Sequence, residues 1–414
     1  MNFRLPLLAA LCGLTFATRA ASPPPEKLLP PDTLGVITVP DWDRASAAMR
    51  DSSAGRLWRD PAMKPFLDKF GAKWNEEVIA PLERELGIKF ADYTELLHGQ
   101  LTLAVTQSGW TGKPDSLPGL LLLLDAKDKP DALKKVVADV RKKWVDSGKQ
   151  IKTEKIRDVE FTTLILTGED VRKSVEKAFP KLKGEADPGK KAGGKVELAL
   201  GQSGSLLLVG TQPKDFEQVL ARQAGGLAAS LADQPGFQAD QSACFRDAHS
   251  YLWVNFKPLI EVLRAQINSS PAGQNENPLG LKPDKILDAL GVNGLRSLAI
   301  GFNQSADGSL GQLFVGLPES GRKGLFKIIV PDAKESGPPP FVPAEVVKFS
   351  RWRLDSQKIW ETLKGIVNEL SPQLSGLLQM TLEAAGKDRD PNFSLERHLD
   401  GLEEALANSL RCAS

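Results

Sequence analysis

Apolar positions along the chain follow two periods, and the change from one period to the other recurs. A short apolar strand is followed by a turn that carries Asp, Lys or Pro, and the turn leads into an amphipathic helix. This strand–turn–helix unit is predicted at residues 33–49, 120–140, 205–221, 251–267 and 345–367. The repetition indicates how the chain is built, and it assigns no chemistry to it.

The order of the predicted elements is also repeated. In each half a short helix precedes two strands joined by a hairpin loop, and a further helix follows. These elements are predicted at 93–97, 101–105, 120–124 and 130–145 in the first half, and at 285–290, 295–302, 310–317 and 321–329 in the second. Hairpins join strands in antiparallel pairs, which argues against a doubly wound parallel sheet. We therefore predict an α+β fold of tandem related modules, with mostly antiparallel sheets packed with amphipathic helices.

The repeat predicts module boundaries. The first module spans residues 33–235, the second spans 236–335, and residues 336–414 begin a further, incomplete unit with a strand at 345–354. Helices are predicted after that strand at 355–370, 374–385 and 395–410, and no strand pair follows to cover them. An amphipathic helix without a partner leaves apolar surface exposed, so we expect residues 371–414 to be poorly packed and the chain to be a fragment of a longer protein.

Large apolar side chains in the first module recur at helical spacing. The set is Trp58, Met63, Phe66, Leu67 and Phe70. Such a stripe is typical of the buried side of a helix. The tryptophans on predicted helices are assigned to the core for the same reason; they are Trp58, Trp74, Trp144 and Trp360.

The N-terminal residues have the pattern of an export signal. Arg4 supplies the positive charge, residues 5–16 the apolar stretch, and residues 18–20 a cleavage site of small residues. Cys12 suggests a lipid anchor, but Leu11 stands where lipidated proteins have a small residue. We therefore predict a cleaved signal at 1–20, a Pro-rich leader at 21–32, and a periplasmic or extracellular protein.

Composition narrows the classes of partner. The 53 basic residues nearly balance the 52 acidic residues, which removes the usual electrostatic argument for nucleic acid. After residue 20 no apolar stretch reaches the length of a membrane-spanning helix. Cys244 and Cys412 are too few for a disulfide framework, and whether they pair is left open. Apolar burial must therefore hold the core.

Several longer stretches carry a family resemblance. They are LGVITVPD (34–41), GRLWRDPAMKPF (55–66), LLLLDAKDKPDALKK (121–135), SLLLVGT (205–211), GRKGLFKI (321–328) and PPPFVPAEVVKFSRWRL (338–354). These stretches resemble a group of large exported bacterial proteins that is classed as a domain of unknown function. The resemblance implies export and a repeated α+β build. It implies no activity, cofactor or catalytic residue.

Candidate chemical groups are few, and each has a structural explanation. His98, His249 and His398 lack the spacing of a metal pair, and the proximity of Cys244 to His249 in the sequence fits a buried thiol better than a nucleophile and its base. The calcium candidates do not follow the EF-hand pattern; they are Asp388, Asp390 and Asp400. No phosphate-binding or nucleophile-elbow motif is found. We predict no catalytic residue, no cofactor and no metal site.

One aromatic residue is a candidate contact for a partner. Trp110 lies in the predicted hairpin loop at 107–119, where an exposed ring would contact a protein or a glycan unless it folds back on its own sheet. With this residue and the modular build, we predict a non-enzymatic exported binding module. Two alternatives are a hydrolase whose site is assembled from distant loops and an envelope component that self-associates through sheet edges.

Overall fold

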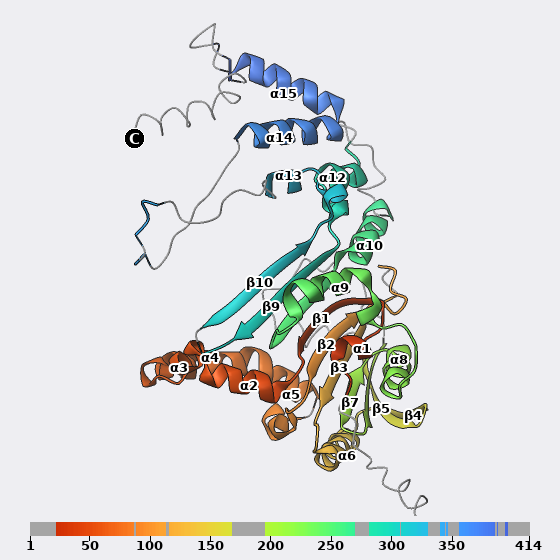
Figure 1. The fold of residues 1–414 in the computed structure, drawn as a ribbon. Helices are drawn as coiled ribbons and strands as arrows, with labels where there is room; N and C mark the ends of the chain where they lie inside the picture. Colours follow the sequence, from red (N-terminus) through yellow and green to blue (C-terminus); the bar gives the residue numbers. More distant parts are fainter. Residues whose placement is uncertain are drawn as a thin grey trace, which may run out of the picture.

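Figure 1 shows the computed structural model of the chain. It describes residues 22–86, 88–112, 116–167, 195–269, 281–306, 308–329, 340–343, 345–346, 356–385, 387 and 394–395. Within these residues, ten strands form one antiparallel sheet with helices packed against it. The α+β class and the antiparallel pairing predicted from the hairpins are confirmed.

The sheet is built around a central pair of strands, β1 (Thr33–Val39) and β8 (Ser250–Asn255). Beyond β1 follow, in spatial order, β2 (Leu101–Thr106), β3 (Gly119–Asp125), β7 (Leu206–Gly210), β6 (Lys195–Ser203), β5 (Val159–Thr167) and β4 (Ile151–Ile156). Beyond β8 follow β9 (Ser297–Gln304) and β10 (Ser309–Gly316). The two edges of the sheet are therefore β10 and β4.

The predicted module boundary at residue 235 does not divide the sheet. β1 from the first predicted module pairs directly with β8 from the second, with Val36 opposite Trp253. The hairpin strands β2 and β3 lie on one side of this pair, and β9 and β10 lie on the other. The tandem modules stay a prediction.

One face of the sheet, called the core face here, holds the largest apolar cluster. It is covered by α1 (Pro25–Leu28), α8 (Pro213–Gln223), α9 (Pro235–Asp240) and the π-helical turn Gln241–Phe245. Trp253 meets Phe237 edge-on with 5.3 Å between ring centroids, and its Nε1 donates to Asp240 Oδ2 at 2.7 Å. Burial of a large side chain stabilises the fold by about 1.5–3 kcal/mol, so this face supplies most of the core.

On the opposite face, only part of the sheet is covered by a well-packed helix. Helix α6 (Pro130–Asp146) has Val140 and Trp144 buried against Leu164 of β5 and Leu200 of β6. The amphipathic helix predicted at 130–145 and the core position of Trp144 are confirmed. This face is therefore closed above β5, β6 and β7.

The remaining helices lie near the two ends of the strands (Figure 1). Between β1 and β2 the chain forms α2 (Trp42–Asp51), α3 (Ser53–Trp58), α4 (Lys64–Trp74) and α5 (Ala80–Leu86), which we call the arm. The elements towards the opposite end are α10 (Phe256–Ser269), α12 (Pro283–Ala289), α13 (Phe326–Ile329), α14 (Ser356–Leu370) and α15 (Pro372–Ala384). None of the residues of α15 is buried, as expected for the described part of 371–414.

Among the described elements, the sequence missed strand β4, helix α1 within the predicted leader at 21–32, and helix α9 next to the predicted module boundary. β4 was not predicted because IKTEKI places two lysines, a glutamate and a threonine between its isoleucines and resembles a solvated turn. The helix expected at 93–97 is a 3-10 helix, Phe90–Leu96. Several predictions lie wholly or mostly outside the described residues: the signal at 1–20 with Cys12, the strand at 345–354, the helix at 395–410, His398, Cys412, Asp388, Asp390 and Asp400.

Candidate functional site

Two of the groups considered for catalysis have structural roles. The Nδ1 of His249 accepts a hydrogen bond from the backbone N–H of Gln304 at 3.2 Å, which fixes the ring against β9. Burial, helped by the negative charge of Asp240, raises the pKa of the Cys244 thiol. A thiol held protonated is a poor nucleophile. In the described part of the chain, no three His, Cys, Asp or Glu side chains come together to hold a metal ion.

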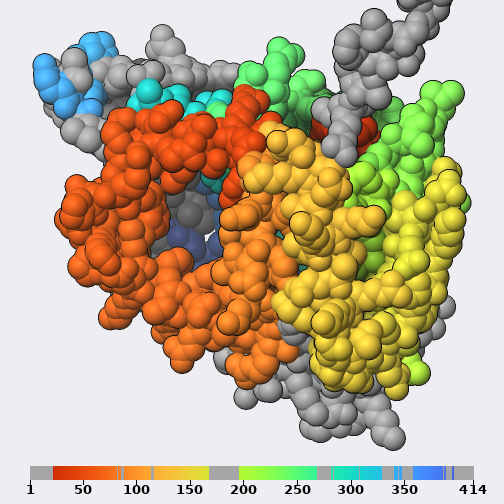
Figure 2. All heavy atoms as spheres, turned by 90° about the horizontal axis from the view of Figure 1, so that it is seen from below, coloured from red at the N-terminus to blue at the C-terminus, as the bar shows by residue number. Residues whose placement is uncertain are grey.

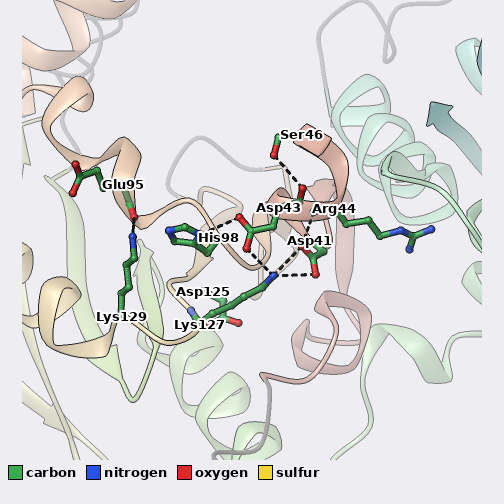
Figure 3. Close-up of polar contacts among 9 residues, drawn as sticks. All are labelled: Asp41, Asp43, Arg44, Ser46, Glu95, His98, Asp125, Lys127 and Lys129. Carbon is green, nitrogen blue, oxygen red and sulfur yellow. Dashed lines mark hydrogen bonds and ion pairs between the residues drawn. The ribbon is translucent and has the colours of Figure 1, made fainter. Parts of the chain in front are cut away.

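His98, the third of these groups, belongs to a polar cluster at the root of the arm (Figure 3). Lys127 Nζ donates to Asp41 Oδ1 at 3.0 Å and to Asp43 Oδ2 at 3.1 Å. Asp43 Oδ1 lies 2.9 Å from His98 Nδ1. The cluster forms where β1 ends, β2 begins and β3 ends, so it joins three neighbouring strands to the start of α2.

Electrostatics show that the cluster is a set of paired charges. Burial opposes the charged form of Asp43, but the hydrogen bonds and positive charges of Lys127 and His98 together outweigh it, and the pKa of Asp43 is lowered. Burial likewise opposes the charged form of Lys127, and the two carboxylates overcome it and raise its pKa. Both partners therefore stay ionised around neutral pH.

Among the described residues, no hydroxyl or thiol is hydrogen-bonded to His98 as the nucleophile of a catalytic arrangement would be. A histidine oriented by a carboxylate acts as a base when a nucleophile lies within its reach. The nearby hydroxyl of Ser46 donates to the backbone carbonyl of Asp43 at 3.1 Å instead. Asp41 caps α2 by accepting the N–H of Arg44 at 3.0 Å. The arrangement anchors the arm to the sheet.

The arm carries an exposed row of aromatic side chains, which we call the aromatic ladder: Trp58, Phe66, Phe70 and Trp74. Between 43% and 54% of each side chain is exposed. The prediction that Trp58, Phe66, Phe70 and Trp74 are buried is wrong. Helical spacing places side chains on one side of a helix, but another element must pack there before they are buried. The arm extends past the sheet, so no described element covers this stripe.

The rings of the ladder stack on one another. Phe66 and Phe70 lie 6.1 Å apart with planes inclined by 16°, and Phe70 and Trp74 lie 6.4 Å apart with planes inclined by 13°. The four rings therefore form one exposed apolar surface, which suits contact with apolar material.

A second apolar surface lies on the sheet, on the side away from the core face. In strand register, Leu313, Ile300, Leu252, Ile37 and Leu103 lie opposite one another across β10, β9, β8, β1 and β2. Ile37 is 52% exposed and Leu313 is 66% exposed. Ile300 and Leu252 are half-buried. The row therefore meets solvent over its whole length.

Neighbouring positions extend this row. Side chains on a strand alternate between faces, so residues two positions away share the surface. Phe302, Val315 and Leu120 meet this condition and are exposed. We call these residues and the row the open face. Figure 2 shows the arm curving away from the body and leaving a hollow between the two.

Trp110 belongs to neither the aromatic ladder nor the open face, and its side chain is half-buried. Its loop is held at the preceding residues, where Ser108 Oγ donates to Asp215 Oδ1 at 2.6 Å and Ser108 N–H donates to Asp32 Oδ2 at 3.2 Å. Gln107 Nε2 donates to the Trp110 carbonyl at 3.3 Å. These bonds hold residues 107–110, and contact of Trp110 with a partner stays a prediction.

Comparison with known proteins adds no relative. No family model matches the chain, and neither a curated protein nor a solved structure matches it. The resemblance to the family of unknown function therefore stays a prediction. Among the helices in the described residues, none has both the length and the apolar character needed to span a bilayer.

Proposed function

We propose that this chain is an exported, non-enzymatic binding protein that holds the acyl chains of a lipid against the open face. The observation that carries the proposal is the row of exposed apolar side chains from Leu313 to Leu103. Exposed apolar patches of several hundred Å² on a folded protein mark binding surfaces. Burial of such a surface stabilises a complex by about 25 cal/mol per Å².

The chemistry of the surface favours an apolar chain over a polar ligand. The row consists of Leu and Ile, which offer no hydrogen bonds to orient a polar molecule. The exposed rings of the aromatic ladder offer a second apolar contact beyond the sheet. The hollow beside the arm leaves space for a flexible chain (Figure 2).

Two further proposals complete this function. Export rests on the signal pattern at 1–20, and intact mass of the secreted protein should begin at or next to Ala21 without a lipid on Cys12. We also propose that the two halves are related copies, supported by the order β3-β2-β1 beside β8-β9-β10. An experimental structure in which these strand triplets fail to superpose would refute the duplication.

The test is binding of a fluorescent fatty acid to delipidated protein. Saturable binding is expected, and the double variant Ile37→Thr, Leu103→Thr should weaken it about tenfold or more, which corresponds to about 1.4 kcal/mol. Threonine retains the strand preference while it removes apolar surface. Leu227→Thr is the matched control, because Leu227 is fully exposed outside the open face and the arm. Absence of saturable binding, or equal binding by the double variant, would refute the proposal.

The hydrolase alternative has its own outcome in the same assay. If the protein turned over an ester of the probe and His98→Ala abolished the turnover while the fold survived, catalysis would replace binding as the function. His249→Ala is the comparison, because its ring bonds the backbone of β9. We expect both variants to change stability alone.

A further inference from the structure

We propose that the outer edge of β10 is an interface between two copies of this chain, joined by antiparallel pairing of β10 with β10 of the second copy. The inference is independent of lipid binding. It starts from the position of β10 at the end of the sheet, where Figure 1 shows it at the outer margin. Each backbone of an edge strand presents unpaired N–H and C=O groups that attract another strand.

The two edges of the sheet differ in the way they meet solvent. β4 carries Lys152, Glu154 and Lys155 within six residues. Charged side chains on an edge strand discourage pairing with other chains. β10 has the sequence SLGQLFVG, with no charge and no proline in eight residues. Only the β4 edge has this protection.

Both faces of β10 are apolar and open. Leu313 and Val315 belong to the open face, and Leu310 and Phe314 point to the other side. All are between 38% and 66% exposed. A strand added at this edge would therefore cover side chains on both faces while it completes the hydrogen bonds of the ladder.

The internal order of the sheet shows what β10 lacks. Counted outward from the central pair of strands, β3 and β10 hold equivalent places. β3 is paired along its outer side by β7, from Leu121–Gly210 to Asp125–Leu206. β10 has no such neighbour among the described strands. In the described sheet, the outer side of this strand position is therefore paired in one half, at β3, and unpaired in the other, at β10.

A second copy is the occupant that matches this edge. An uncharged strand pairs best with an uncharged strand, because a charge opposite an apolar residue loses its water. Of the two edges in the described sheet, β10 is the uncharged one. Pairing of β10 with β4 of another copy would be head-to-tail and would continue into filaments, whereas pairing of β10 with itself closes as a two-fold dimer.

The sequence of β10 is complementary to itself in the antiparallel direction. When Gln312 lies opposite its own copy, Leu310 lies opposite Phe314 and Gly311 lies opposite Leu313. Large side chains then meet small or apolar ones, and the two glutamines meet at the axis. The arm reaches the turn beside β10, where Arg56 Nη2 donates to the Ala306 carbonyl at 3.4 Å. The residues Ser309–Val315 of β10 are themselves exposed, so the strand is accessible along its length.

The experiment measures mass by light scattering and amide exchange by mass spectrometry on the full mature chain over a range of concentrations. A dimer that dissociates on dilution is expected, with exchange of the β10 amides slowing as concentration rises. A monomer at every concentration would overturn the proposal. Protection of β10 that does not depend on concentration would overturn it too, because the edge would then be covered within one chain.

Matched variants locate the contact. Leu310→Lys with Gln312→Lys places like charges across the two-fold axis and should weaken the dimer about a hundredfold. Neither residue belongs to the open face, so saturable binding of the fatty acid should be retained. Thr153→Lys on the β4 edge is the control and should leave the dimer intact. If Thr153→Lys dissociates the dimer and the β10 variant does not, the interface lies elsewhere and the proposal is wrong.

Discussion

The two faces of the central strands are similarly apolar, but helices cover the core face and leave the open face exposed. On the core face, Trp253 of β8 lies opposite Val36 of β1 and is 1% exposed. Ile37, the next residue of β1, lies on the open face and is 52% exposed. A step of one residue along a strand changes the face. The difference shows that an apolar residue in a strand is buried only where helices of the same chain cover it.

The same contrast appears along the opposite face of the sheet. Leu200 of β6 is buried by α6, whereas Leu103 of β2 lies on the same side without such a cover. The apolar surface therefore continues from β6 to β2, but helix α6 covers only the part above β5, β6 and β7. We interpret the uncovered part as a surface kept for a ligand, and the following predictions test the contrast.

The largest difference is expected between Trp253→Ala and Ile37→Ala. Removal of the buried Trp253 leaves a cavity beside Phe237 and takes one hydrogen bond from the Asp240 carboxylate, and should lower the free energy of unfolding by about 3–5 kcal/mol. Ile37→Ala should cost less than about 1 kcal/mol, because its side chain is half exposed. Urea unfolding measures both. Equal losses would show that the open face is covered in solution.

A pH effect is expected from the core face. Burial raises the pKa of Asp215, although hydroxyls of Ser108 and Thr106 donate to it and oppose the shift. A raised pKa means tighter proton binding in the folded state. The stabilisation is therefore complete below the unfolded pKa of about 3.9 and is lost as pH rises through the folded pKa.

Asp215→Asn should remove this dependence, because an amide does not titrate. Relative to the variant, the wild type should lose unfolding free energy as the pH rises from 4 to 7. Urea unfolding at several pH values gives the comparison. Parallel pH profiles would mean that Asp215 is charged at acidic pH and that its burial does not control its proton.

A smaller effect is expected at the root of the arm. Lys127→Met leaves Asp41 and Asp43 without their cation and should cost less than about 1 kcal/mol, since these groups are partly exposed and screened. The lowered pKa of Asp43 gives stability that is present above its unfolded pKa and lost as pH falls through the folded value. The raised pKa of Lys127 gives stability that is lost as pH rises through its folded value, above 10.5.

Amide exchange in α2 should report the loss of this anchor in Lys127→Met. Lys129→Met is the control, because Lys129 Nζ donates to the backbone carbonyl of Glu95 and not to the aspartates. Faster exchange of α2 in the Lys127 variant alone is expected. Equal exchange in both variants would show that the backbone contacts of α2 suffice to hold the arm.

The smallest change in stability is expected from the aromatic ladder. Phe70→Ala should alter the unfolding free energy by less than about 0.5–1 kcal/mol, because the ring is 54% exposed. Phe216→Ala, on the core face, is the matched control and should cost about 3–5 kcal/mol. Thermal or urea unfolding separates the two. A large loss from Phe70→Ala would place the ladder in contact with another part of the chain.

The sequence was most informative about local structure. Strand and helix periods located β1, β2, β3, β8, β9, β10 and α6, because apolar alternation and amphipathic spacing are local properties. It failed at β4, where charges that protect an edge strand hide its strand pattern. It also failed at the ladder, where Phe66 and Phe70 have core spacing and no core to pack on.

One signal for the open face was already in the sequence. Residues 120–124 are consecutive leucines, so β3 is apolar on both sides. Such strands are typical of sheets buried on both faces. Leu121 and Leu123 meet this expectation, and Leu120 is exposed. The residues of the candidate site could be recognised as apolar, but their exposure could not be predicted.

By itself, then, the sequence determined most strands and helices, the α+β class, and the apolar character of both faces of the central strands. These depend on the periods of neighbouring side chains and on backbone preferences within each segment. Only the tertiary structure decided that β1 pairs with β8 in one sheet, that the arm projects from it, and that one face stays open. Those outcomes depend on which distant segments meet, because strand pairing and helix packing bring together residues hundreds of positions apart.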